Sequence, residues 1–334
     1  MKIKKIGIFI AVIMLFTLTL SQCAKDEEKD STKELKEVNV LLDWYPNAVH
    51  SFLYAAKEQG YFKEEGLNVN LITPAGTDDG IKLVAAGKAD LAISYPKQVI
   101  IARGENIPVK LVGTIVRSPL NHLMVRKDSG VKTLKDLEGK KIGYPSFDID
   151  KKTVEAMIKD SGGDPSKVEF VDVGYDLMPS MQTKRVDAII GGFINHEKIL
   201  LEKEGMEIVT FNPVDSKIPN IYELGFIASE DGISNNKDAI EGFLSAAKKG
   251  FDYTKNNPEG AVDLILKAQN ESFPLDAETE QKSLKILLPL MEDKSGNFLS
   301  QDENTFSNYK KWLENNSFLT EKVESTDIFK NIVN

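Results

Sequence analysis

The eight residues DWYPNAVH bring together several kinds of side chain that can bind a small molecule. Asp43 and Trp44 end an apolar run, Asn47 can cap the helix that follows, and His50 falls in the first turn of that helix. An aromatic face beside a carboxylate and an imidazole suits stacking on, and hydrogen bonding to, a flat heterocycle. A structural role fits equally well, with Trp44 in the core and His50 on the surface. The residues themselves leave both interpretations open.

Two further stretches place polar or aromatic side chains where a predicted strand ends. ISYPKQ puts Ser94 and Tyr95 there, and IGYPSFDID puts Tyr144 and Ser146 there. In open α/β sheets, ligands bind beyond the carboxyl ends of strands, where helix N-termini offer unpaired N–H groups. These four residues are therefore ligand candidates, although Tyr95 could equally be packing. The aspartates that follow Ser146 are ordinary charges for the start of a helix, and we discount them.

The stretch IIGGFINHEKI is a fourth strand end of this kind. Its two glycines let the backbone approach a neighbour closely, and Phe193, Asn195, His196 and Glu197 follow before the next helix. The Glu197 carboxylate could accept N–H bonds from the edge of an aminopyrimidine, or it could be a solvated helix residue. All four residues are candidates for binding a ligand.

Other candidates are weaker, and several kinds of site are excluded. Arg117 lies near the loop after a predicted strand, and Tyr222 lies just before a predicted crossing between lobes, so either could reach a cleft. The three histidines, His50, His122 and His196, lack the spacing of metal ligands. The sequence also has no P-loop, no GxGxxG after a strand, no HExxH and no GxSxG. We therefore expect no metal, no cofactor and no catalytic residues.

Charge and composition narrow the range of partners. The chain has 334 residues, a formal charge of −9 and 41% hydrophobic residues, which fits a globular protein of two domains. A nucleic-acid partner is excluded, because a phosphate-binding surface needs concentrated positive charge. Only four of the 42 basic residues are arginine, so bidentate clamps on several carboxylates or phosphates are not expected.

The N-terminus has the layout of a secretory signal. Three lysines precede sixteen uncharged, mostly apolar residues, a run short for a membrane span, and LSQC follows soon after. LSQC resembles a lipobox, although Gln22 stands where a small residue is usual; an uncleaved anchor with an ordinary cysteine is the alternative. We expect a signal peptide at 1–22, a lipid on Cys23 and a polar tether over 23–37. The mature chain would then be anchored by lipid at the extracytoplasmic face of the cell membrane.

From Val38 the chain alternates strands and helices, which is the pattern of an α/β sheet. Turn residues separate the elements, and the pattern restarts once in the middle of the chain. The strands are predicted at 38–44, 67–74, 90–96, 109–116, 141–146, 167–176 and 186–193, and the main helices between them at 48–59, 78–87, 97–104 and 150–163.

The two halves echo each other weakly. GKADLAISYP and TKRVDAIIGGF each place a basic residue two positions before an aspartate, Asp90 or Asp187, and an isoleucine three positions after it. Chance could produce one echo of this length, but taken as real it predicts two similar α/β lobes. The patterns after residue 230 are helical and bring no new strands, so we expect them to return and pack on the first lobe.

The second lobe is therefore interpreted as an insertion in the first. We expect lobe 1 at 38–125 and 225–334 and lobe 2 at 126–224, with crossings near Leu123–Arg126 and Leu224–Ala228. Two such crossings make a hinge, and ligand sites favour the cleft between the lobes of a hinged protein.

Six segments within residues 38–230 resemble the thiamine-pyrimidine-precursor-binding proteins: LDWYPNAVH, GYFKEEGLNV, GKADLAISYP, LKDLEGKKIGYPS, VDAIIGGFINHE and PNIYELGFIAS. That family has the type II periplasmic-binding-protein fold, serves ABC importers, and shares a superfamily with the eukaryotic-type pyrimidine precursor synthase. The resemblance implies a monomeric binding protein for formylaminopyrimidine or hydroxymethylpyrimidine, with a permease and an ATPase as partners.

The resemblance also implies that both lobes contribute ligand contacts, which lobe closure would bring together. The first lobe would contribute Asp43, Trp44, Asn47, His50 and Tyr95, and the second lobe Ser146 and Glu197.

Three alternatives stay open. Relatives with this fold bind riboflavin, aliphatic sulfonates, taurine or nitrate; a flavin would stack on the same aromatic rings, whereas an anion needs fixed positive charge, for which only Arg117 is placed. A synthase-like enzyme is disfavoured, because that enzyme carries a cysteine-rich segment for metal-dependent chemistry and the single cysteine here is Cys23. The third alternative is an interaction protein without any small ligand.

Overall fold

The structure is a computed structural model that describes residues 34–269 and 273–333. Residues Leu35–Asn334 cluster as one compact unit. The predicted signal peptide, Cys23 and most of the predicted tether lie outside the described residues. Among the helices of the described ranges, none is long and apolar enough to cross a membrane.

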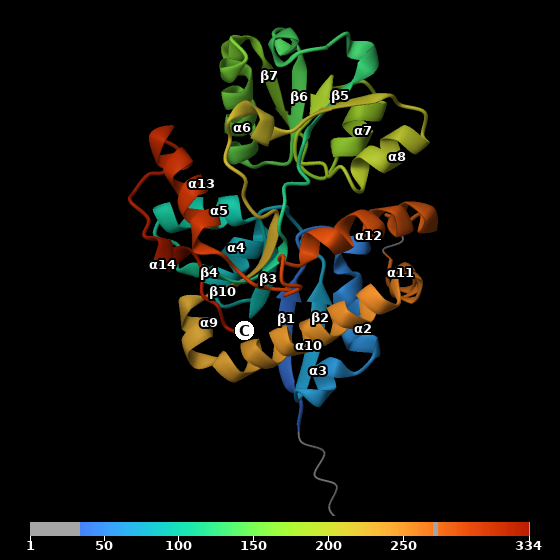
Figure 1. Cartoon of the computed structure of the whole chain (residues 1–334), viewed down its shortest axis with the longest axis vertical. Coiled ribbons are helices and arrows are strands. Elements are labelled where there is room, and N and C mark those ends of the chain that lie inside the picture. The colour runs from blue at the N-terminus through green and yellow to red at the C-terminus, as the bar shows by residue number, and fades with distance from the viewer. Residues whose placement is uncertain (1–33, 270–272, 334) are drawn as a thin grey trace, which may run out of the picture. The chain divides into compact units, whose positions relative to one another are not determined.

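A five-stranded sheet forms the centre of the first lobe, in the order β2-β1-β3-β10-β4 (Figure 1). β1 pairs in parallel with β2 and β3, whereas β10 is antiparallel to both β3 and β4. β3 and β4 are almost entirely buried, as their continuous apolar runs predict for strands covered on both faces. The strands are β1 (Lys36–Leu41), β2 (Leu67–Ile72), β3 (Leu91–Ser94), β4 (Val109–Val116) and β10 (Leu224–Ser229).

The second lobe repeats this arrangement with the order β7-β6-β8-β5-β9. β6 is parallel to β7 and β8, and β5 is antiparallel to β8 and β9, so each strand has a counterpart in the first sheet. The predicted pair of similar α/β lobes is therefore confirmed at the level of strand order. The strands are β5 (Leu123–Arg126), β6 (Lys141–Tyr144), β7 (Glu169–Asp172), β8 (Ala188–Ile189) and β9 (Ile208–Phe211).

The two aspartates of the sequence echo occupy equivalent places. The Asp90 carboxylate accepts the backbone N–H of Asn39 at 2.9 Å, and the Asp187 carboxylate accepts the backbone N–H of Lys141 at 3.0 Å. Each aspartate immediately precedes the third strand of its sheet and bonds to the neighbouring parallel strand. The echo thus reflects one recurring way of joining two parallel strands.

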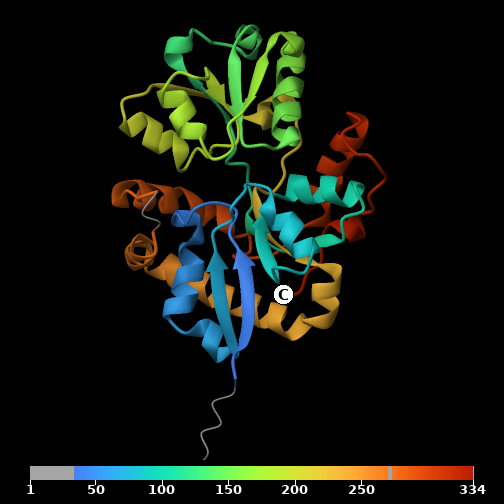
Figure 2. The same cartoon turned by 180° about the vertical axis from the view of Figure 1, so that it is seen from behind.

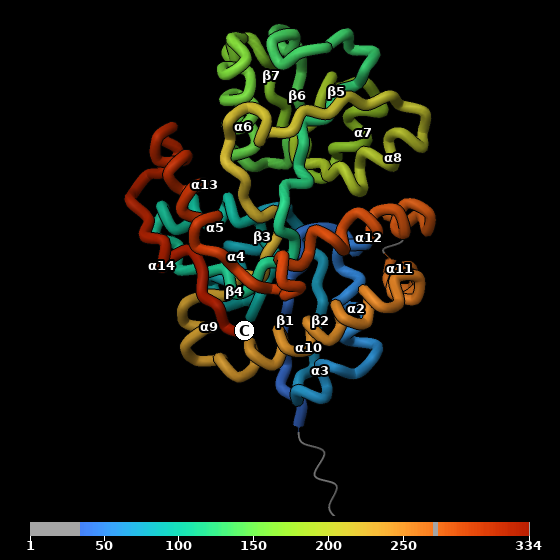
Figure 3. The backbone as a smooth tube through the Cα atoms, in the orientation of Figure 1, coloured from blue at the N-terminus to red at the C-terminus, as the bar shows by residue number. Residues whose placement is uncertain are grey.

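The chain passes between the sheets twice, at 117–122 and at 212–223, as the tube in Figure 3 shows. The sequence placed the crossings slightly later, at Leu123–Arg126 and Leu224–Ala228. Those segments are instead buried strands, because their apolar side chains pair into the two sheets. The crossing segments are joined to each other: one oxygen of the Glu223 carboxylate accepts the N–H groups of Leu120 at 2.6 Å and Asn121 at 3.0 Å.

The C-terminal helices return to the first lobe, as the sequence predicted. Figure 2 shows α10 beside α2 and α3, which lie far from it in the sequence. At Gly250 an added Cβ would lie 2.2 Å from the Phe52 carbonyl oxygen, so only glycine allows α10 to approach α2 this closely. The helices of this lobe are η1 (Ala48–His50), α2 (Ser51–Glu58), α3 (Tyr61–Glu64), α4 (Asp79–Ala85), α5 (Pro96–Gly104), α9 (Glu230–Asn235), α10 (Lys237–Asn256), α11 (Pro258–Lys267), α12 (Ala277–Met291), α13 (Glu303–Asn315) and α14 (Ser325–Ile328).

Two helices, α12 (Ala277–Met291) and α8 (Glu197–Lys203), position side chains of the candidate site. α12 belongs to the first lobe and packs against α8 of the second lobe and against η1 (Figure 1). The helices of the second lobe are α6 (Asp148–Asp160), α7 (Leu177–Gln182) and α8 (Glu197–Lys203), with short 3₁₀ turns η2 (Lys127–Ser129), η3 (Leu134–Leu137), η4 (Pro165–Lys167) and η5 (Pro213–Ser216).

Candidate functional site

A buried hydrogen-bond chain fixes the segment after β1. The His50 side chain is fully buried, and its Nε2 lies 2.9 Å from Asp43 Oδ1. The backbone N–H of Asn47 donates to His50 Nδ1 at 3.2 Å, which places the ring proton on Nε2, facing Asp43. The Tyr95 hydroxyl donates to the other oxygen of Asp43 at 3.2 Å. Burial, followed by the nearby Asp43 charge, raises the pKa of Tyr95 well above its usual value, so this hydroxyl keeps its proton.

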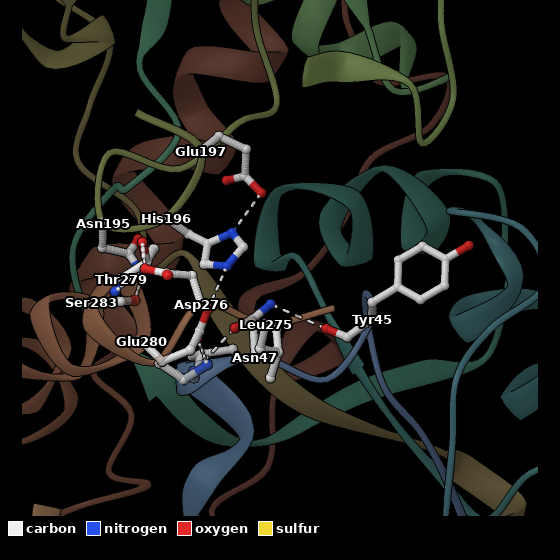
Figure 4. Close-up of polar contacts among 12 residues, drawn as sticks. Tyr45, Asn47, Asn195, His196, Glu197, Leu275, Asp276, Thr279, Glu280 and Ser283 are labelled. Atoms are coloured by element: carbon white, nitrogen blue, oxygen red, sulfur yellow. Dashed lines mark hydrogen bonds and ion pairs between the residues drawn. The ribbon is translucent and has the colours of Figure 1, made fainter. Parts of the chain in front are cut away.

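Asn47 holds the turn that begins the helical segment. Its side-chain oxygen accepts the N–H of Val49 at 3.1 Å, and its amide nitrogen donates to the Tyr45 carbonyl at 3.1 Å. Ala48 lies between Asn47 and Val49, and its backbone N–H is not capped by the Asn47 side chain. This N–H donates to the Glu280 carboxylate at 2.7 Å. An acid from α12 thus completes the cap of the first-lobe loop (Figure 4).

His196 lies between two carboxylates, as Figure 4 shows. Its Nδ1 is 3.1 Å from Glu197 Oε1, and its Nε2 is 2.9 Å from Glu280 Oε1. Burial disfavours the charged imidazolium, but Glu197 and then Glu280 outweigh burial and raise the pKa of His196 to about 10. Both ring nitrogens therefore carry protons at neutral pH, and His196 is a cation held between an acid of each lobe.

Glu197 is the first residue of α8 and is itself buried. Its second oxygen accepts the N–H of Phe193 at 2.7 Å. Burial alone would raise the pKa of this carboxyl, but the His196 charge and these hydrogen bonds lower it, so Glu197 is ionised. The glycines before it allow the turn: Gly191 has a φ of +104°, and an added Cβ there would meet Pro145 at 2.5 Å, as the sequence predicted for a close approach.

A cavity of about 490 Å³ opens beside these groups. Tyr175 meets Trp44 edge-on with ring centroids 4.4 Å apart, and Tyr45 stacks on Phe273 with centroids 3.6 Å apart. The volume lies within the range of small-molecule sites, which are mostly apolar with a few placed polar groups. The lining residues are Trp44, Tyr45, Pro46, Asn47, Tyr175, Leu177, Met178, Pro179, Gln182, His196, Glu197, Leu200, Glu204, Phe273, Pro274, Leu275, Asp276 and Glu280.

A small recess of about 20 Å³ adjoins the cavity and shares four of its lining residues. The recess places Asp43, the carboxylate that bonds to His50, next to the second-lobe segment that follows β8. The recess is lined by Asp43, Trp44, Asn47, Val49, Tyr95, Gly191, Phe193, His196 and Glu197.

Most of the residues that the sequence singled out at the first and fourth strand ends therefore meet in one place. His50 does not line either space but bonds to Asp43 behind the recess. Ser94 lines a separate small hollow on the other side of Asp43 and Tyr95. The sequence candidates brought together at the cavity or the recess are Asp43, Trp44, Asn47, Tyr95, Phe193, His196 and Glu197.

Five other candidates lie outside both linings, each for a local reason. The Arg117 guanidinium is used within the first lobe, where it donates to the Tyr222 hydroxyl at 3.1 Å and to Ser300. Tyr222 accepts this bond and so points away from the cavity. Tyr144 packs edge-on against Phe170 within the second lobe.

The remaining two candidates also form hydrogen bonds outside the cavity. The Ser146 hydroxyl is exposed and donates to Asp172 at 2.7 Å. The Asn195 amide is buried and donates to the Ser283 hydroxyl of α12 at 2.8 Å, so it joins the lobes instead of facing the cavity. A polar residue at a strand end can thus reach either a ligand or the other lobe, and sequence position does not distinguish the two.

Sequence reasoning missed Glu280, which bonds to both lobes. A signal was present: Glu280, Ser283, Leu284 and Leu287 recur at helical spacing and are all buried. A carboxylate in the buried stripe of a helix is rarely left without a partner. The stripe could therefore have marked Glu280 as functional, although it could not have named His196 as the partner.

The sequence also discounted an acid that the structure buries. Asp150, at the start of α6, forms an ion pair with Lys97 of α5, and Asn121 donates to the same carboxylate at 3.2 Å. This pair joins the lobes at the hinge, away from the cavity. It is a structural ion pair of the lobe junction, which the ordinary helix-start interpretation did not anticipate.

Comparisons with known proteins identify the family of the chain. The family model described as NMT1/THI5 like matches residues 47–261. A formylaminopyrimidine-binding protein of Halalkalibacterium halodurans is 40% identical over 321 residues, covering 96% of this chain and 97% of that protein. A 4-amino-5-hydroxymethyl-2-methylpyrimidine phosphate synthase of Legionella pneumophila is 28% identical over 240 residues, covering 70% of this chain and 73% of that protein.

Solved structures show the same fold. The alkanesulfonate-binding protein of Xanthomonas axonopodis pv. citri matches with a TM-score of 0.70 and 11% identity, covering 89% of this chain and 99% of that one. The predicted two-lobed periplasmic-binding-protein fold is therefore confirmed. With a family model that spans most of the chain and a relative at 40% identity, the chain belongs to the NMT1/THI5-like family.

Proposed function

We propose that the chain is the substrate-binding component of an ABC importer and binds a thiamine pyrimidine precursor of the formylaminopyrimidine or hydroxymethylpyrimidine type. The observation that carries the proposal is the cavity between α7, α8 and α12, in which Trp44, Asn47, His196 and Glu197 meet. The name of the 40%-identical relative supports the ligand class. We propose a binding protein and not an enzyme of the synthase type.

The roles follow from the geometry of the cavity. Trp44 is the stacking platform for the pyrimidine ring. The ionised Glu197 accepts N–H bonds from the amino edge of the ring, and its orientation is fixed by Phe193 and His196. Both oxygens of Asp43 are already bonded, to His50 and to Tyr95, so Asp43 fixes the loop that carries Trp44.

Ligand binding is coupled to closure of the lobes about the two crossings. Direct hydrogen bonds between the lobes support this proposal. The Thr77 hydroxyl of lobe 1 donates to the Pro145 carbonyl of lobe 2 at 3.1 Å, and the Tyr175 hydroxyl of lobe 2 donates to the Pro74 carbonyl of lobe 1 at 3.3 Å. The lobes that close are those proposed from the sequence, 38–125 with 225–334 and 126–224.

The location is part of the same proposal. A lipid on Cys23 holds the mature chain at the extracytoplasmic face of the membrane, as a monomer that docks on a permease and ATPase of other chains. Metabolic labelling with a palmitate analogue, compared between the natural chain and Cys23→Ala, tests the anchor. Labelling that survives Cys23→Ala would contradict it.

Tryptophan emission tests the ligand. The chain has two tryptophans, and Trp312 of α13 packs against Tyr309 and Phe318, away from the cavity lining. Full-length chain carrying Trp312→Phe is titrated in detergent with formylaminopyrimidine, hydroxymethylpyrimidine, riboflavin and taurine. Saturable quenching by a pyrimidine is expected. A response to riboflavin alone would transfer the proposal to flavins, and no response to any of these compounds would overturn it.

A further inference from the structure

We infer that the cavity selects its pyrimidine by charge: it takes a ligand whose side group is neutral or positive and rejects the phosphorylated form. The inference rests on the proposed function and adds a substrate class to it. Four carboxylates line the cavity, and among the lining residues of the described chain none is lysine or arginine. The four are Glu197, Glu204, Asp276 and Glu280.

The positive charges near the cavity do not balance these four carboxylates. His196 is the single lining residue that carries positive charge, and it is shared by Glu197 and Glu280. Lys203 reaches Asp276 at 2.6 Å but is not part of the lining. Glu204 accepts a hydrogen bond from Gln182, a neutral donor, so its charge has no cation beside it in that contact. The lining therefore keeps an excess of negative charge.

Asp276 and Glu197 stay ionised around neutral pH. The Lys203 ammonium, followed by hydrogen bonds from Thr279, lowers the pKa of Asp276 to about 2. The His196 charge and the Phe193 N–H keep the pKa of Glu197 below its usual value despite burial. Protonation of these groups cannot relieve the repulsion that a dianionic phosphate would meet.

The features that normally bind phosphate are already occupied by the protein's own acids. Helix N-termini bind anions through unpaired N–H groups. At the start of α12, the Asp276 side chain accepts the N–H of Thr279 at 2.9 Å. At the start of α8, Glu197 itself occupies the first turn and accepts the N–H of Phe193. A phosphate entering the cavity would meet an acid already placed at each of these two helix starts, and no lysine or arginine among the lining residues.

The walls favour cations for an independent reason. The faces of aromatic rings are negative and attract ammonium and heteroaromatic cations, most strongly where water is excluded. Trp44, Tyr45, Tyr175 and Phe273 form one cluster of such rings, with Tyr45 and Tyr175 centroids 5.1 Å apart. Rings and carboxylates together match an aminopyrimidine that carries an uncharged or ammonium side group.

A ligand series with one ring and three side groups tests the inference. The 5-aminomethyl, 5-hydroxymethyl and 5-phosphooxymethyl forms of the same aminopyrimidine carry a positive, a neutral and a negative side group. Calorimetric titration of the full-length chain in detergent should give a dissociation constant for the phosphate ester at least a hundredfold above that of the hydroxymethyl form. The aminomethyl form should bind at least as tightly as the hydroxymethyl form.

Variants separate charge from shape. Glu204→Gln should narrow the gap between the hydroxymethyl and phosphate forms several-fold, because it removes a charge that no cation offsets. Glu202→Gln is the matched control: Glu202 lies in the last turn of α8, just before Glu204, pairs with Lys198 at 2.6 Å and does not line the cavity, so the gap should not change. Formylaminopyrimidine is titrated alongside the series. Equal affinity for the phosphate and hydroxymethyl forms would overturn the charge inference alone, whereas no binding by any of the three or by formylaminopyrimidine would overturn the proposed function as well.

Discussion

His196 of the second lobe and Glu280 of the first lobe are joined across the cavity at 2.9 Å. The same Glu280 carboxylate accepts the Ala48 N–H, and the same imidazole holds Glu197. Glu280 therefore links the loop that carries Trp44 to the segment that carries Glu197, the proposed acceptor of ligand N–H groups. A change at either residue should affect lobe closure and ligand binding together.

Glu280→Gln should weaken ligand binding and destabilise the fold. The carboxylate is fully buried, and its loss leaves the buried His196 cation with one acid and weakens the bond to Ala48. Breaking a buried ion pair from one side costs about 3 to 5 kcal/mol. Affinity by calorimetry and the free energy of unfolding by urea titration measure the two effects. Glu278→Gln, an exposed neighbour on α12, is the control and should cost less than about 1 kcal/mol. Equal losses in the two variants would contradict the special role of Glu280.

Stability should fall between pH about 6.5 and pH about 10. The folded state raises the pKa of His196 from 6.5 to about 10, chiefly because Glu197 and Glu280 overcome the effect of burial. A raised pKa contributes stability that is complete below the unfolded pKa and is lost as pH rises through the folded pKa. Urea midpoints from pH 6 to pH 10 measure the slope, and His196→Gln should flatten it. A slope that is unchanged in His196→Gln would assign the effect to other groups.

Trp44→Ala should reduce affinity for the pyrimidine by about 1 to 3 kcal/mol, because a stacked ring at the centre of a site contributes that much. Trp312→Phe, which alters the other tryptophan outside the cavity lining, should leave affinity unchanged. Calorimetric titration of both variants with the pyrimidine measures the two affinities. If Trp44→Ala binds as tightly as the natural chain, Trp44 does not contact the ligand.

Lys97→Met should destabilise the fold by about 3 to 5 kcal/mol, because it leaves Asp150 buried without its cation. Although burial disfavours the ammonium, the Asp150 and Glu223 charges raise the pKa of Lys97 above its usual value, so Lys97 is charged. Lys82→Met, which breaks an exposed pair with Asp78, should cost less than about 1 kcal/mol. Urea titration of both variants tests this, and the combined change Lys97→Met with Asp150→Leu should recover much of the loss. No recovery in the combined variant would show that the uncompensated charge is not the cause.

Local patterns predicted much of the fold. The alternation of apolar and polar runs located most of the strands but missed β5 and β9, and the echo around Asp90 and Asp187 correctly indicated two lobes of like strand order. These features depend on residues close together in the sequence and on the spacing at which apolar residues recur along a helix or a strand. The crossings were misplaced because strands that enter a sheet immediately after a crossing look like any other apolar run.

The site was predicted only in part, because part of it depends on distant pairing. Trp44, Asn47 and Glu197 follow strands directly, so their place at a strand end was visible. Glu280 lies more than eighty residues from His196, and nothing local links the two. Arg117 was the reverse case: its position looked suitable, but its guanidinium is used by Tyr222 and Ser300. Whether a polar side chain is free or already bonded is a tertiary property.

The Glu223 carboxylate, which holds the two crossings together through Leu120 and Asn121, limits how the lobes can move. Because these hydrogen bonds tie the two crossing segments to each other, we expect the segments to move together, and sliding one past the other would first have to break the Glu223 bonds. Opening and closing is then expected to keep the same faces of the two lobes opposite each other.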